Sequence, residues 1–119
     1  NIKKKLYTIF GYKGKQVRDN VHAYDVASFV EFFLEKPRIA EVYNLGGGRN
    51  NSVSILEAFN LIERITSIPM KFKYINTNRI GDNICYYSNL KKIKTHYPEW
   101  HIKYNLNKIF NDIVENINL

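Results

Sequence analysis

Two stretches decide how this sequence is interpreted: G-K-Q-V-R-D-N-V-H-A-Y-D-V-A at Gly14–Ala27, and R-I-G-D-N-I-C-Y-Y-S at Arg79–Ser88. In each, an arginine (Arg18 or Arg79) is followed closely by an aspartate, and the two arginines lie about sixty residues apart. Guanidinium groups that meet from distant parts of a chain suit a diphosphate, because each presents a planar fork of N–H donors to phosphate oxygens. The sequence therefore predicts a site at which two arginines hold a diphosphate.

The composition bounds the class of protein. A chain of 119 residues is long enough for one domain at most, and 45% hydrophobic with 14% aromatic residues is typical of a folded globular protein. No apolar run approaches the roughly 18 residues that span a membrane. The single cysteine, Cys85, agrees with a reducing cytoplasm, and the three histidines lack the spacing of metal ligands. We expect a cytoplasmic protein with no membrane partner and no metal.

The basic charge needs an explanation of its own. A net charge of +7 and a pI near 9.5 are compatible with nucleic-acid binding. The lysines, however, are spread along the chain, and lysine, asparagine and isoleucine are together the residues that an A/T-rich genome favours. We therefore expect no nucleic-acid partner. A non-catalytic, basic nucleotide-binding module stays open as an alternative class.

The first third of the chain predicts a strand, a turn, an extended segment and a helix. Apolar and β-branched residues predict a strand at Leu6–Gly11, and glycine predicts a turn over Tyr12–Lys15. Gln16–His22 alternates weakly, as an extended segment does. Asp25 is placed to cap a helix that runs to about Lys36.

The rest of the chain continues the α/β mixture. The same signals predict a strand at Glu41–Leu45, a helix from the capping box of Ser54 to about Thr66, a strand at Met70–Ile75, a short helix from Ser88 or Asn89 to about Lys94, and a final helix at Asn105–Ile117. These few strands do not make a complete doubly wound sheet. The expected fold class is therefore α/β, but only a portion of such a fold.

A third stretch, V-Y-N-L-G-G-G-R at Val42–Arg49, lies between the two arginine motifs. The order and the amino-acid sequences of the three stretches resemble the C-terminal part of extended short-chain dehydrogenase/reductases that act on nucleotide sugars. These enzymes form the NAD-dependent epimerase/dehydratase family. The resemblance runs from about Ile9 to Trp100. It is greatest to the branch that inverts C2 of a CDP-linked sugar by oxidation, rotation and reduction. UDP-sugar 4-epimerases and dTDP-sugar 4,6-dehydratases, which share the arginine motifs, remain alternatives.

Two motifs of that family are missing from the chain. Its dinucleotide loop, G-x-x-G-x-x-G, has no counterpart, since the glycines at Gly46–Gly48 have the wrong spacing. The spacing Y-x-x-x-K occurs at Tyr104 and Lys108, outside the resemblance, and at Tyr87 and Lys91, which overlap the end of the second arginine motif and not the catalytic motif of the family. The chain also begins with Asn1. We therefore expect the C-terminal third of a larger enzyme, with no catalytic and no cofactor-binding residue of its own.

The resemblance also implies a domain organisation. Residues 1–45 would bridge the substrate lobe and the last strand and helix of a Rossmann-type cofactor domain, and residues 46–119 would form a small α/β nucleotide-sugar-binding lobe. The Rossmann core itself, which would bind NAD, is absent from this chain. The complete enzyme is expected to be a homo-oligomer.

The resemblance assigns roles to six substrate-binding residues. Arg18 and Arg79 match arginines that contact the diphosphate of a nucleotide sugar, and an ion pair of Arg18 with a carboxylate is the alternative. Asp82 matches an aspartate that binds ribose hydroxyls, although it could equally cap a turn at Gly81. The remaining three concern the nucleoside: Phe10 beside the pyrimidine base, the backbone near Thr8 at the edge of the base, and Tyr86 near the same nucleotide. Core packing is the alternative for Phe10 and Tyr86.

Overall fold

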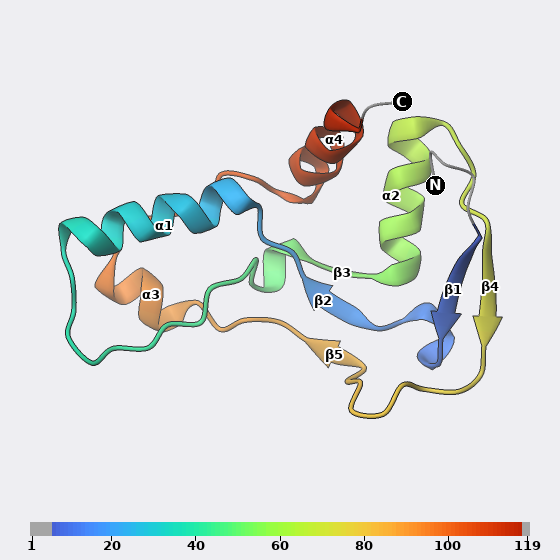
Figure 1. Ribbon diagram of the computed structural model, residues 1–119, viewed down its shortest axis with the longest axis horizontal. Coiled ribbons are helices and arrows are strands. Elements are labelled where there is room, and N and C mark those ends of the chain that lie inside the picture. The colour runs from blue at the N-terminus through green and yellow to red at the C-terminus, as the bar shows by residue number, and fades with distance from the viewer. Residues whose placement is uncertain (1–5, 118–119) are drawn as a thin grey trace. The chain divides into compact units, whose positions relative to one another are not determined.

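The computed structural model describes residues 6–117, which form two compact units that alternate along the sequence. The first unit comprises residues 6–18, 53–86 and 110–117, and the second comprises residues 19–52 and 87–109. The division expected at residue 45 concerns domains of a longer enzyme and stays a prediction. Figure 1 shows the order of the elements.

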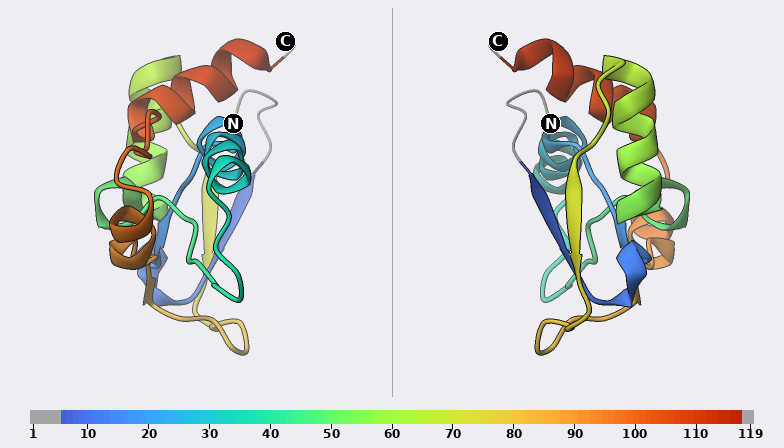
Figure 2. Two further views of the ribbon diagram at one scale, coloured as in Figure 1. Left: turned by 90° about the vertical axis from the view of Figure 1, so that its left-hand side faces the viewer. Right: turned by 90° about the vertical axis from the view of Figure 1, so that its right-hand side faces the viewer.

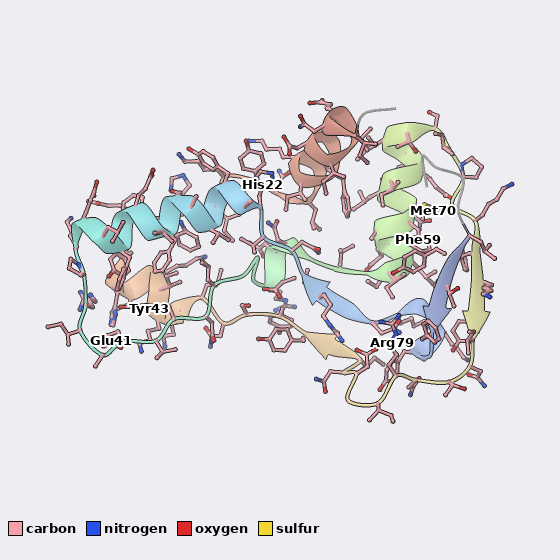
Figure 3. The ribbon with its side chains drawn as sticks, in the orientation of Figure 1. His22, Glu41, Tyr43, Phe59, Met70 and Arg79 are labelled. Carbon is pink, nitrogen blue, oxygen red and sulfur yellow. The ribbon has the colours of Figure 1, made fainter. Side chains whose placement is uncertain are left out.

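The first unit is built on a two-stranded parallel sheet. β1 (Tyr7–Phe10) pairs with β4 (Phe72–Ile75) in a register that sets Tyr7 opposite Phe72, and both views of Figure 2 show these strands side by side. Phe59 of α2 (Ile55–Thr66) is buried against the sheet. Its ring centroid lies 5.1 Å from that of Tyr7 and 5.4 Å from that of Phe72 (Figure 3). Aromatic contacts thus fix the helix to the strands.

Local signals set both ends of α2, as the sequence predicts. Ser54 accepts the backbone N–H of Glu57, whose carboxylate accepts the backbone N–H of Ser54 at 2.9 Å, so the capping box is complete. At the other end Ser67 adopts a left-handed conformation and donates its N–H to the Glu63 carbonyl. The helix expected at this position is confirmed.

A second sheet has the strand order β3-β2-β5. Val17 and Arg18 of β2 (Val17–Asp19) pair in parallel with Cys85 and Tyr86 of β5 (Cys85–Tyr86). β3 (Ser52–Ser54) and β5 were not expected, because two or three residues are too few to show a period. The extended segment expected after Gln16 is confirmed as β2, and the turn before it forms the short 3₁₀-helix η1 (Tyr12–Gly14).

The core of the second unit lies between α1 (Ala23–Glu35) and α3 (Lys91–His96). The Trp100 side chain is 1% exposed and packs edge-on against Phe29 of α1 at 5.5 Å. Its indole N–H donates to the Asp25 carbonyl at 3.2 Å, so this large side chain is both buried and paired. The buried residues of this cluster are Phe29, Leu90, Ile93, Tyr97 and Trp100. The other elements are η2 (Arg49–Asn51) and α4 (Leu106–Asn116).

Two sequence expectations in the second unit are wrong. His22, and not Asp25, caps α1, because its Nδ1 accepts the N–H of Tyr24 at 3.1 Å. Asp25 lies one turn further on, fully buried, and accepts the N–H groups of Lys103 and Tyr104. The strand expected at Glu41–Leu45 is irregular chain. Among residues 6–117 no strand pairs with that segment, and a strand needs a hydrogen-bonded neighbour.

Candidate functional site

A cavity of about 160 Å³ in the first unit brings together every predicted substrate-binding residue except Tyr86. Segments far apart in the sequence line it: β1, Gln16 just before β2, β2 itself, the first residue of α2, and the loop 76–83. Its lining residues are Tyr7, Thr8, Phe10, Gln16, Arg18, Ile55, Arg79 and Asp82. Tyr86 pairs with Arg18 through the backbone of β5 but is 55% exposed and does not line the cavity.

Arg79 reaches the cavity from the loop that follows β4. Its guanidinium carbon lies 4.6 Å from the centroid of the Phe10 ring, in a cation–π contact (Figure 3). The contact covers one face of the half-buried Phe10 ring and holds the exposed arginine at the end of β1. A cation and an aromatic ring are therefore adjacent in one wall of the cavity.

Arg18 reaches the cavity from β2 and forms an ion pair with Asp82. Its guanidinium also donates to the Asn83 carbonyl at 2.7 Å, and the Tyr12 hydroxyl donates to the Asp82 carbonyl at 3.0 Å. These contacts fix the loop 76–83 against β2 and η1. The ion pair between Arg18 and a carboxylate, an alternative raised by the sequence, is present, and the arginine still borders the cavity.

The turn before β2 holds the same loop from the other side. Gly11, at φ +62°, approaches Asn78 so closely that a Cβ atom would lie 1.7 Å from the Asn78 Oδ1. That oxygen accepts the N–H of Tyr12 at 3.2 Å, and the Tyr74 hydroxyl accepts the N–H of Lys13 at 2.9 Å. Only glycine fits at position 11 without moving the loop that carries Arg79 and Asp82.

Gln16 was missed by the sequence analysis. It lies between the glycine turn and Arg18, is 6% exposed, and donates its Nε2 hydrogen to the Phe10 carbonyl at 2.5 Å. A neutral amide inside an arginine motif carries no distinctive charge or spacing. Only its burial in the cavity wall identifies it.

The glycine cluster Gly46–Gly48 lies in the second unit and is held by Asp19. One carboxylate oxygen of Asp19 accepts the N–H of Gly48 at 2.9 Å and the N–H of Ser88 at 3.0 Å. Burial acts to raise the pKa of Asp19. The hydrogen bonds from Ser88 and Gly48 outweigh this effect, so the pKa of Asp19 lies below its ordinary value. Asp19 is therefore a structural anion.

Tyr104 and Lys108 also have structural contacts in the second unit. The Tyr104 ring stacks on His22 at 4.0 Å, and the ammonium of Lys108 donates to the Lys103 carbonyl at 3.3 Å. Across residues 6–117, no three His, Cys, Asp or Glu side chains are grouped so that they could hold a metal ion. In the same residues no helix has the length and apolar character needed to cross a membrane.

The site combines two arginines, an aromatic ring and a strand edge around one cavity, on an α/β scaffold. Guanidinium forks suit phosphate oxygens, and aromatic rings suit the faces of bases. A molecule that carries both phosphates and a base would match these groups.

Known proteins are similar to this chain, although no family model matches it. CDP-paratose 2-epimerase from Salmonella typhi is 36% identical over 100 residues, which are 81% of this chain and 28% of the relative. UDP-glucuronate 4-epimerase from Thermodesulfobacterium geofontis is 34% identical over 113 residues, which are 93% of this chain and 34% of the relative.

Solved structures show the same fold. A dTDP-glucose 4,6-dehydratase from Bacillus anthracis in complex with NAD matches with a TM-score of 0.80 and 29% identity, over 96% of this chain and 35% of its own. A UDP-glucuronic acid 4-epimerase from Bacillus cereus in complex with UDP-glucuronic acid and NAD matches with a TM-score of 0.81 at 23% identity, over 98% of this chain and 37% of its own. The chain spans about a third of the length of such relatives. Its resemblance to the NAD-dependent epimerase/dehydratase family and its α/β class are confirmed.

Proposed function

We propose that this chain is the substrate-binding, C-terminal part of an NAD-dependent nucleotide-sugar epimerase, and that it holds the nucleoside diphosphate. One observation carries the proposal: Thr8, Phe10, Arg18, Arg79 and Asp82, which the family resemblance singles out, line one cavity. Unrelated surface residues from three separate segments of a chain have no reason to converge in this way.

Within the family we infer a CDP-paratose 2-epimerase, also called CDP-tyvelose epimerase. The inference rests on the residues of the three motifs and on the 36% identity to the Salmonella typhi enzyme. A UDP-sugar 4-epimerase is the second candidate, because the UDP-glucuronate 4-epimerase relative is 34% identical over more of the chain. A dTDP-sugar 4,6-dehydratase is the third, because such an enzyme matches in structure at 29% identity.

Among residues 6–117, the glycine cluster Gly46–Gly48 does not fit the pyrophosphate of NAD, and we infer that NAD is bound mainly outside this chain. The N–H of Gly48, in the only glycine cluster, already bonds to Asp19, and a dinucleotide pyrophosphate needs free amides at the N-terminus of a helix. We infer that sequence outside this chain binds the cofactor and supplies the catalytic residues, so no chemical step is assigned to the residues here. The complete enzyme would be a cytoplasmic homo-oligomer.

The task of this chain is then to anchor the nucleotide while the sugar moves. An epimerase must let the sugar ring rotate between two faces, and a loosely held ring escapes unless another part of the substrate is held tightly. We propose that Arg18 and Arg79 bind the diphosphate, that Phe10 and the Thr8 backbone meet the base, and that Asp82 accepts a ribose hydroxyl. Tyr86, outside the cavity, is proposed to approach the nucleotide from β5.

The test is a comparison of substrates with the complete enzyme that contains this chain. We expect turnover of CDP-linked sugars in preference to UDP- and dTDP-linked sugars, with NMR locating the inverted carbon at C2. A preference for a UDP-sugar with inversion at C4 would select the second candidate and leave the diphosphate site in place. Failure to bind any nucleoside diphosphate would contradict the proposed function as a whole.

A further inference from the structure

The amide of Gln16 has only one reasonable orientation. Its nitrogen donates to the Phe10 carbonyl at 2.5 Å. A carbonyl oxygen only accepts, so turning the amide over would set two acceptors against each other. The contact with Phe10 therefore directs the Gln16 Oε1 atom elsewhere.

That oxygen has no hydrogen-bond partner. Within residues 6–117, Gln16 Oε1 is the one buried side-chain nitrogen or oxygen atom for which no partner is found. Buried acceptors are nearly always paired, so a buried acceptor without a partner indicates that its donor is a group outside the chain. Gln16 lines the cavity together with Phe10, Arg18 and Arg79, so a molecule in that cavity is a candidate source of the donor.

The edge of β1 that does not pair with β4 carries further polar groups. The N–H groups of Tyr7 and Gly11 donate to β4 and its flank, at Lys71 and Ile75. Residues of a parallel strand alternate in the direction of their N–H and C=O groups, so Thr8 and Phe10 direct theirs to the opposite edge. The contact of Gln16 with the Phe10 carbonyl on that edge agrees with this alternation.

We propose that Gln16 reads the nucleobase, with its Oε1 atom accepting an N–H from the edge of a pyrimidine. A strand edge with backbone N–H and C=O groups, an amide oxygen without a partner and an aromatic ring together match a planar heterocycle that bears N–H and C=O groups. The two arginines beside them match its diphosphate. The donor is either the amino group of cytosine or the N3–H of uracil. The inference rests on the proposed function, because it places the base in the cavity described above.

The test measures what the base contributes to binding. With the complete enzyme, calorimetry compares CDP with ribose 5-diphosphate, which lacks only the base. Replacing Gln16 with methionine, of similar length but without an acceptor, should weaken CDP binding about tenfold, the usual effect of one lost hydrogen bond to a buried group. Binding of ribose 5-diphosphate should change less than about twofold. Asn60→Met is the matched control, an exposed amide on α2 outside the cavity, and should alter neither affinity.

A second arm uses the unaltered enzyme, so it does not depend on whether Gln16→Met folds. If the donor is the cytosine amino group, N4,N4-dimethyl-CDP should bind about tenfold more weakly than CDP; if it is the uracil N3–H, N3-methyl-UDP should bind about tenfold more weakly than UDP. Gln16→Met should abolish whichever difference is found.

Equal losses for CDP and ribose 5-diphosphate in Gln16→Met, or no loss for either, would overturn the role of Gln16 and leave the proposed function intact. If the unaltered enzyme binds CDP no more tightly than ribose 5-diphosphate, the role of Gln16 is likewise overturned and the proposed function is left intact. If the unaltered enzyme binds neither, the proposed function and the role of Gln16 fail together.

Discussion

Arg18 and Arg79 each have a partner within the chain, and the partners differ in kind. Arg79 lies over the ring of Phe10, and Arg18 is paired with the carboxylate of Asp82. The Arg18 side chain is 40% exposed, and ion pairs in such surroundings contribute only about 0–1 kcal/mol. A doubly charged diphosphate can therefore bind both guanidinium groups, because breaking the existing ion pair costs little free energy.

The first prediction concerns these two side chains in the complete enzyme. Arg18→Ala and Arg79→Ala should each weaken binding of CDP by about 1.5–3 kcal/mol, the range for hydrogen bonds to charged groups. Binding of cytidine, which has no phosphate, should change much less. Calorimetry with both ligands measures the difference.

Arg64→Ala is a control for this prediction, since Arg64 is an exposed arginine of α2 whose guanidinium donates to the Asn60 carbonyl away from the cavity. Equal losses for CDP and cytidine in the Arg18 and Arg79 variants would mean that these arginines do not hold phosphate.

At the scale of elements, the sequence predicts well what is decided locally. The helix from Ser54 was predictable because its capping box is complete within four residues. The strand expected at Glu41–Leu45 is absent. Its apolar pattern was misleading, because a strand also depends on a neighbouring strand, which the pattern cannot reveal. Asp25 was misassigned for a related reason: its partners, Lys103 and Tyr104, lie far along the chain.

The second prediction concerns the capping box of α2. The hydroxyl of Ser54, and then its backbone N–H, lower the pKa of Glu57 below its ordinary value of 4.5. A lowered pKa in the folded state means that the ionised carboxylate stabilises the fold above about pH 4.5, and that this contribution is lost as the pH falls through the folded value. Ser54→Ala should lower the free energy of unfolding at pH 7 by about 1 kcal/mol.

Urea unfolding at several pH values measures this effect. The loss caused by Ser54→Ala should shrink as the pH falls below 4.5 and through the lowered pKa of folded Glu57, because Glu57 is then protonated in both proteins. Ser28→Ala, a serine inside α1 and away from any cap, serves as the control. A Ser54→Ala loss that stays constant from pH 7 to pH 3 would show that Glu57 does not take part.

At the scale of the whole molecule, the family resemblance singled out five of the eight residues that line the cavity, and chemical reasoning from the sequence alone singled out fewer. Both arginines could be inferred from their chemistry, but the meeting of Arg18 with Asp82 and of Arg79 with Phe10 depends on the fold. Gln16 escaped notice because a single neutral amide has no pattern.

The third prediction follows from the missing dinucleotide loop and from the structural contacts of Tyr104 and Lys108. The isolated chain of 119 residues should show no turnover of a nucleotide sugar in the presence of NAD, and it should bind NAD weakly. A coupled assay with CDP-, UDP- and dTDP-linked sugars measures the first, and calorimetry the second. Robust turnover by the isolated chain would contradict the proposal that the chemistry lies elsewhere.

The last prediction concerns apolar side chains that the isolated chain exposes in its second unit. In the irregular segment after α1, Ile39 is 97% exposed and Val42 is 80% exposed. Exposed apolar residues on chain that could pair as a strand favour association. Sedimentation velocity should therefore detect self-association at micromolar concentration, and the double substitution Ile39→Lys with Val42→Lys should reduce it. Ile80→Lys is the matched control, because Ile80 is fully exposed in the polar loop of the first unit and should not affect association. A monodisperse monomer before any substitution would show that these residues need no partner. A reduction by the single Ile80→Lys as large as that by the double substitution would show that added charge, and not this segment, controls association.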